Sequence, residues 1–253
     1  MGDIARFSIN NEDRLYKLFG INAELLIDHA WGYEFCTIHD IKNYKPSTNS
    51  LSSGQVLHEP YDYKKAKLIV NEMMDLLVLD IVDKHLITDH IVLTVGYDIE
   101  NLTNPIIRNK YDGDIVKDFY GRYVPKSAHG TIRLDYKTSS TKIIMKAINN
   151  LYDRIVNPLL LVRRINIAVC NLVDEYVEKD KVEYQQLNLF LDNKKEIDLK
   201  IKSKEEEKVE RNVQRTIIDI KKKYGKNAIL KGMNYIDGAT TIQRNLQIGG
   251  HKG

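Results

Sequence analysis

The sequence predicts an α+β fold built on a ferredoxin-like order of strand, helix, strand, strand, helix and strand. Two observations lead to this prediction. Segments with apolar residues at helical spacing alternate with segments rich in β-branched residues, and residues 129–173 alone read as strand, helix and strand. In this arrangement both helices cover one face of a four-stranded sheet. The other face of the sheet is therefore expected to be open.

The first half of the pattern lies before residue 98. A short extended piece is expected over Ser52–Leu57, and a long amphipathic helix over Tyr61–Lys84. His90–Tyr97 alternates and is rich in β-branched residues, which predicts a strand. The segment Asp98–Ser127 contains Asn-Pro, Asp-Gly, Tyr-Gly and Val-Pro pairs. It is predicted to be a long loop or an irregular hairpin.

The second half of the pattern completes the sheet. Strands are predicted over Thr131–Tyr136 and Leu161–Val169. Between them, Ser139 or Ser140 is a suitable cap for a helix that ends near Val156, where an Asn-Pro pair follows. Residues 46–175 are thus expected to form one domain.

Two further regions flank this domain. Residues 1–45 are predicted to hold short helices over Asp3–Phe7, Glu12–Phe19 and Ala23–Trp31, with too few apolar residues for a core of their own. Residues 176–253 form a charged tail in which Val209–Tyr224 is an amphipathic helix and the rest is expected to be partly extended.

Composition excludes several classes of protein. The 253 residues carry a formal charge of +3 with a pI of about 8.6, which permits binding to nucleic acid without requiring it. No apolar run is long enough to span a bilayer and no secretory signal is visible, so a cytoplasmic location without membrane partners is expected. The two cysteines and scattered histidines form no metal-binding or nucleophile motif.

Basic and small polar residues gather at the strand starts and ends of the predicted sheet. Arginine side chains, hydroxyl groups and glycine amides suit contacts to phosphate oxygens. The alternative is that the Arg163–Arg164 pair is one solvated residue beside one structural residue. The candidate contacts are Ser52, Ser53, Gly54, Arg133, Lys137, Thr138, Arg163 and Arg164.

A short apolar island interrupts the charged tail. Leu187, Leu189 and Phe190, preceded by Gln186, have no neighbouring apolar sequence with which to form a core. They are therefore expected to bind a pocket on a partner protein. The alternative is that they fold back onto the sheet.

These motifs together resemble a known family. LSSGQVL, HGTIRLDYKTSSTK, LLVRRINIAV and QLNLF are similar to the C-terminal half of Y-family translesion DNA polymerases, in the ImpB/MucB/SamB-like branch of Gram-positive bacteria and their phages. RLYKLFGINAELLIDHAWG is similar to that family's thumb, and KKKYGKNAILKGMN extends the resemblance to the tail.

The resemblance implies a role in DNA damage bypass and the SOS response. The four-stranded domain would be the little finger, which grips the primer-template backbone through Arg163, Arg164 and the segment Ser52–Gly54. QLNLF resembles the peptide that binds the bacterial sliding clamp, with its glutamine in one subsite and its leucine and aromatic residues in an apolar pocket.

The resemblance also implies what is missing. The family's palm carries the carboxylates for the two metal ions of nucleotidyl transfer, and no residues here match it. Residues 1–5 resemble an internal point in the thumb, so Mg²⁺ belongs to a palm and fingers outside this chain, which is expected to hold no cofactor and to be inactive alone. Two alternatives remain open: an RNA-binding βαββαβ module, and a non-catalytic decoy that occupies the clamp.

Overall fold

The computed structural model describes residues 1–44, 49–179, 193–248 and 251–252, with side chains described for 1–44, 49–177 and 205–247. The chain divides into two compact units, Met1–Thr48 and Asn49–Gly253.

The N-terminal unit is helical, as predicted. Helix α1 (Gly2–Phe19) joins the first two predicted helices across a kink at Asn11, whose φ of −137° is not helical, and α2 (Asn22–Trp31) and α3 (Ile38–Asn43) follow. Most large apolar side chains of this unit are exposed, and its buried apolar residues are few and small apart from Leu15. The prediction that this region has little core of its own agrees with that burial.

The second unit has the predicted order of strands and helices. The elements are β1 (Leu51–Tyr61), α4 (Tyr63–Asp83), β2 (Leu86–Tyr97), β5 (Ala128–Thr138), α7 (Thr141–Ile155) and β6 (Val162–Cys170). The α+β fold is therefore confirmed. Asp62 caps α4 and Ser140 caps α7, each accepting a hydrogen bond from the backbone N–H three residues later.

The sheet has the strand order β1-β6-β2-β5, and every pair is antiparallel. The two βαβ units, β1-α4-β2 and β5-α7-β6, are therefore interleaved. The second strand of each unit lies at the sheet centre, whereas the ferredoxin-like order has the first strands there, so the sheet is a variant of that arrangement. The short strand β7 (Val173–Asp174) pairs with the start of β2.

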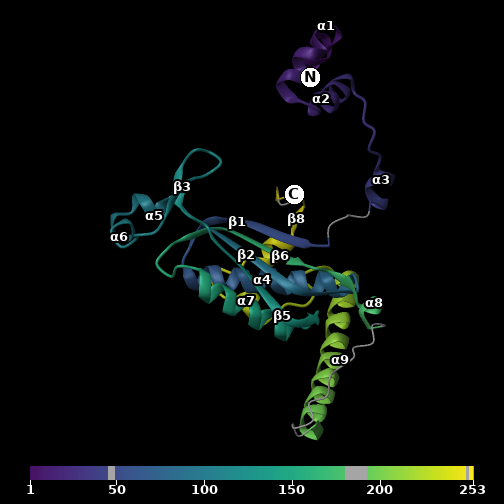
Figure 1. The fold of residues 1–253 in the computed structure, drawn as a ribbon, viewed down its shortest axis with the longest axis vertical. Coiled ribbons are helices and arrows are strands. Elements are labelled where there is room, and N and C mark those ends of the chain that lie inside the picture. Colours follow the sequence, from purple (N-terminus) through teal and green to yellow (C-terminus); the bar gives the residue numbers. More distant parts are fainter. Residues whose placement is uncertain (45–48, 180–192, 249–250, 253) are drawn as a thin grey trace. The chain divides into compact units, whose positions relative to one another are not determined.

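Helices α4 and α7 lie together on one side of the sheet (Figure 1). The core forms between these helices and the inner faces of the central strands, where side chains alternate between buried and more exposed. Its main members are Ile69, Val70, Met73, Ile144, Ile148, Leu151, Ile91, Leu93, Val95, Ile165, Ile167 and Val169.

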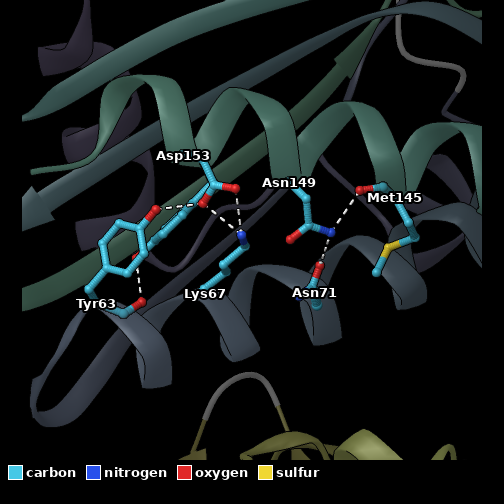
Figure 2. A network of polar contacts seen from close by, with 7 residues as sticks. Tyr63, Lys67, Asn71, Met145, Asn149 and Asp153 are labelled. Carbon is cyan, nitrogen blue, oxygen red and sulfur yellow. Dashed lines mark hydrogen bonds and ion pairs between the residues drawn. The ribbon is translucent and has the colours of Figure 1, made fainter. Parts of the chain in front are cut away.

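Polar contacts join the solvent side of α4 to α7 (Figure 2). The Asp153 carboxylate accepts hydrogen bonds from Lys67 Nζ at 2.6 and 2.7 Å and from the Tyr63 hydroxyl at 2.5 Å. The Lys67 and Tyr63 bonds hold the pKa of Asp153 below its usual value, and burial together with the bond to Asp153 raises the pKa of Tyr63 to about 12. One turn away, the Asn149 amide donates to Asn71 Oδ1 at 2.8 Å. These contacts fix how the two helices align.

The segment between β2 and β5 is an ordered insertion that ends in a hairpin. It contains α5 (Glu100–Thr103), α6 (Pro105–Arg108), β3 (Ile115–Lys117) and β4 (Tyr123–Pro125), with β3 and β4 paired. Of the two forms expected from the sequence, the hairpin is the one observed.

The C-terminal region is more ordered than its composition suggests. The described elements are α8 (Glu175–Lys179), α9 (Asn193–Tyr224), the 3₁₀ helix η1 (Gly232–Tyr235), α10 (Thr241–Asn245), β8 (Gln247–Ile248) and β9 (His251–Lys252). Helix α9 begins before the predicted Val209, because Lys, Glu and Leu have high helix propensity and a docked helix propagates easily. Ile218 of α9 joins the core. Within the described residues no helix is long and apolar enough to cross a membrane.

Candidate nucleic-acid interface

Strand register defines which residues share the side of the sheet opposite α4 and α7. Side chains alternate along each strand, so residues paired across the sheet with Arg164 or Asn166 lie on the same side. Three cross-strand rows result, which are called the open face below: Ser52–Ala168–Val92–Thr131, Gly54–Asn166–Thr94–His129 and Val56–Arg164–Gly96. His90 continues the face, paired with Cys170 and Arg133.

Arg164 stands at one end of the open face. It pairs with Val56 on one side and with Gly96 on the other, and it is exposed. A Cβ atom at Gly96 would lie 3.3 Å from the Arg164 Cβ, which is a tight contact. Gly96 therefore leaves room for the Arg164 side chain, and a glycine at this position also allows another backbone to approach the sheet closely.

Arg133 stands toward the other end, on the edge strand β5. Its partner His90 and the Arg164 partner Gly96 are six residues apart on β2. At the rise of an antiparallel strand this separates the two arginines by about 20 Å along the strand direction. The paired residues of the open face include these two arginines and no carboxylate. The face can thus attract anions at two separated points.

Arg163 has a different environment from its neighbour. The pairing of β6 with β2 shifts between Gly96 and Tyr97, so Arg163 falls in a bulge rather than in a row. Its Nε lies 3.6 Å from Asp98 Oδ2, and the carboxylate is mostly buried. Asp98 therefore balances part of the Arg163 charge, whereas Arg164 keeps its charge on the open face.

The predicted Ser52–Gly54 segment contributes to both sides of the sheet. Ser52 and Gly54 are exposed on the open face, in rows with Ala168 and Asn166. Ser53 alternates with them and is directed to the helix side. Because side chains alternate along β1, only Ser52 and Gly54 of this segment join the open face.

Lys137 and Thr138 lie at the end of β5, beyond the irregularity that separates Thr88 and His90 of β2. Thr138 is 3% exposed, and its hydroxyl accepts a hydrogen bond from the backbone N–H of Ser140 at 3.0 Å. Lys137 is partly exposed, and it already interacts with another residue of the protein. The structure therefore places Thr138 in the turn before α7 rather than on the open face.

Sequence reasoning missed several residues of the open face. Asn166, Thr94 and His129 form one row with Gly54, and Thr94 Oγ1 lies 2.9 Å from His129 Nδ1. The alternation that places Arg164 outward also places Asn166 outward, so this residue could have been found from the strand prediction. The same holds for Thr94, which alternates with Leu93 and Val95 in the predicted strand His90–Tyr97, whereas His129 lies outside the predicted strand Thr131–Tyr136.

Two other predictions concern peptide and metal binding. Gln186, Leu187, Leu189 and Phe190 lie outside the described residues. Among the residues that the structure describes, no three His, Cys, Asp or Glu side chains gather as metal ligands would.

The fold and this face define an α+β domain whose antiparallel sheet is covered on one side and carries arginines on the other. Residues 48–189 match the model of the impB/mucB/samB family C-terminal domain, so the chain belongs to that family. The resemblance to the C-terminal half of its Y-family polymerases is thereby confirmed, and the chain carries a little-finger domain. A search of curated proteins finds no match.

Solved structures include two similar chains. The little-finger chain from a "complex of beta-clamp processivity factor and little finger domain of PolIV" is 10% identical with a TM-score of 0.32, over 56% of this chain and 99% of that one. A "post-insertion binary complex of Dbh DNA polymerase" is 13% identical with a TM-score of 0.30, over 67% of this chain and 41% of that one. Both TM-scores are below 0.5, so neither similarity identifies individual residues.

Proposed function

We propose that this chain is the part of a cytoplasmic translesion DNA polymerase that grips primer-template DNA and docks on the sliding clamp. The open face holds the sugar-phosphate backbone through Arg133 and Arg164, and Ser52 and Gly54 allow close approach to it. Nucleotide addition belongs to a palm with metal-binding carboxylates, which no part of this chain resembles.

The observation that carries the proposal is the charge pattern of the open face. Two arginines about 20 Å apart along the strands match about six phosphate steps of one DNA strand along the helix axis. Small and polar residues between them give a shallow surface, which fits a duplex backbone. No sequence preference is expected, because the contacts are with phosphates and not with base edges.

The RNA-binding alternative requires exposed aromatic rings on the central strands, where unpaired bases would stack. The paired open-face residues of β2 and β6 include no Phe, Tyr or Trp. This pattern favours binding to a duplex backbone over reading of single-stranded RNA.

Titrating primer-template DNA with the purified chain at several salt concentrations tests the DNA part of the proposal. We expect the logarithm of the binding constant to fall linearly with the logarithm of the salt concentration, with a slope of about −0.9 for each phosphate contacted. We also expect single-stranded RNA to compete poorly. Preferential binding of the RNA would select the RNA-binding alternative, and clamp binding without measurable DNA affinity would select the decoy.

The clamp part of the proposal is tested separately, by a double substitution in the tail. Leu189→Ala with Phe190→Ala should abolish binding to a bacterial sliding clamp, because both side chains fill an apolar pocket in the proposed mode. Val177→Ala, an exposed apolar residue upstream in the tail, serves as the control. Surface plasmon resonance on immobilised clamp measures the effect, and equal binding by the double variant and the parent chain would exclude the peptide.

A further inference from the structure

The tip of the β3–β4 hairpin exposes aromatic side chains to solvent. Phe119 is 97% exposed, Tyr120 is 71% exposed, and Tyr123 is exposed beside them. A phenylalanine that makes almost no contact within its own domain is unusual, and such residues often mark a binding surface. The phosphate contacts proposed for the open face do not account for this exposure of Phe119.

The tip is held in one shape by its own hydrogen bonds. Asp118 Oδ1 accepts the backbone N–H groups of Tyr120 and Arg122, each at 2.9 Å, and Asp118 Oδ2 accepts Arg122 Nε at 2.8 Å. These bonds from Arg122 and Tyr120 hold the pKa of the Asp118 carboxyl below its usual value. Gly121 completes the turn with a φ of +77°, a conformation that favours glycine. The aromatic side chains are thus presented on a pre-formed turn.

The aromatic rings are arranged with cations close to them. The Phe119 and Tyr120 rings meet edge to face with centroids 5.6 Å apart, and the Arg122 guanidinium lies 5.1 Å from the centre of the Tyr120 ring. Lys117 Nζ lies 5.2 Å from the Tyr123 ring. Residues 114–126 hold three basic and two acidic side chains; Arg122 pairs with Asp118 and Lys126 with Asp114, so the excess positive charge of the hairpin is that of Lys117. Interleaved rings and cations suit a stacked base with a phosphate next to it.

The insertion that carries the hairpin is tied to the end of the sheet beside Arg163 and Arg164. The buried Asn101 side chain donates to the backbone carbonyl of Leu161 at 2.8 Å and accepts the Leu161 N–H at 2.7 Å. Leu161 directly precedes β6. Figure 1 shows the β3 hairpin extending beyond the end of the sheet, away from α4 and α7. The hairpin therefore lies beyond the end of the sheet at which Leu161, Arg163 and Arg164 stand (Figure 1).

We propose that Phe119 and Tyr120 stack on unpaired bases of a single-stranded DNA overhang that leaves the duplex held by the open face. This inference rests on the proposed function and adds a second contact to it. Lys117 and Arg122 attract the phosphates of the overhang, and the aromatic rings accept any base, because every base has a π face. A partner protein with an apolar pocket would fit this hairpin less well, because cations lie between the aromatic rings.

The test compares two DNA ligands that share one duplex, one blunt and one with a single-stranded 5′ overhang. The parent chain should bind the overhang ligand more tightly. Phe119→Ala with Tyr120→Ala should remove most of that preference, about tenfold for a lost stacked base, and leave blunt-duplex affinity unchanged. Phe119→Trp should retain it, and 2-aminopurine in the overhang should show quenched fluorescence only with chains that keep the rings.

Ile106→Ala is the matched control, because Ile106 is an exposed apolar residue of the same insertion on α6. Thermal unfolding should be unchanged in all of these variants, since Phe119 has almost no contacts to lose. If the double variant keeps the full preference for the overhang while the parent binds blunt duplex in a salt-dependent way, the hairpin inference is wrong and the backbone grip stands. If the parent binds neither ligand, both are wrong.

Discussion

Substitution of Glu72 by glutamine is expected to detach residues 226–247 from helix α4 while the sheet remains folded. Glu72 is 1% exposed, although it carries a carboxyl group. Its carboxylate accepts hydrogen bonds from Asn234 Nδ2 at 2.8 Å and from the Thr240 backbone N–H at 2.7 Å. A glutamine would direct its own N–H₂ group at one of these donors. Leaving a buried donor unsatisfied costs about 1–3 kcal/mol, a cost that undocking avoids.

Hydrogen exchange and limited proteolysis measure this detachment. The amides of η1 and α10 should exchange faster in the Glu72→Gln variant, and trypsin should cut sooner after Lys231 and Arg244. Both side chains are bound in the parent chain: Lys231 Nζ lies 2.5 Å from Asp75 Oδ1, and Arg244 Nη1 donates a hydrogen bond to Gln55 Oε1 at 3.0 Å. Glu59→Gln makes the same change at an exposed position of β1 and should alter neither readout. Unchanged exchange in the Glu72 variant would show that the carboxylate does not hold the segment.

Removal of the Arg211 side chain should destabilise the packing of α9 on the rest of the domain by about 3–5 kcal/mol, the usual effect of breaking one side of a buried ion pair. Arg211 forms an ion pair with Glu175, which is buried, and its Nη2 donates to Ser139 Oγ at 2.6 Å. The next residues of the helix support the same contact, since Gln214 donates to the Ser139 carbonyl at 2.9 Å. In Arg211→Ala, the buried Glu175 carboxyl group would lose this partner.

Urea unfolding followed by circular dichroism checks this prediction. Arg215→Ala, one turn along the same helix and exposed, should change stability by less than about 0.5 kcal/mol. Replacing both partners, Arg211→Met with Glu175→Leu, should restore most of the loss, because no unpaired charge is then buried. A double variant as unstable as Arg211→Ala would mean that the ion pair is not the source of the effect.

The fold class was predictable because apolar periodicity differs between helices and strands. The six elements of the βαββαβ unit lie where the spacing of apolar residues and the predicted cap at Ser140 place them, although helix α4 begins at Tyr63, after the cap Asp62, and not at the predicted Tyr61. The strand order was not predictable, because the choice between central and edge positions depends on which strands pair, and pairing joins residues far apart in the sequence. The same holds for the docked tail: Glu72 lies within an amphipathic helix, and only the fold brings it to Asn234 and Thr240.

The candidate site was predictable in part. Ser52, Gly54, Arg133 and Arg164 share the open face, as residues at predicted strand positions can. Arg163 was predicted together with Arg164, but the bulge in β6 and the contact with Asp98 separate their roles. A bulge has no reliable sequence signal, so the two arginines could not be distinguished beforehand. Whether any of these residues contacts DNA stays a prediction.

The exposure of the aromatic residues on the β3–β4 hairpin could not be predicted from the sequence either. The Gly and Pro pairs of this segment indicated a loop or hairpin, yet the exposure of Phe119 follows from the Asp118 turn and the anchoring of the insertion at Leu161. Neither contact is visible in the pattern of residues alone.

The salt dependence of DNA binding by Arg133→Ala with Arg164→Ala tests the central claim most directly. The control is Lys146→Ala with Arg215→Ala, which removes two charges from exposed positions on α7 and α9. If the open face holds the phosphate backbone, the arginine variant should bind primer-template more weakly and lose about 2 from the logarithmic salt slope, while the control keeps the parent's slope. Equal affinity and equal slope for the arginine variant and the parent would contradict the account.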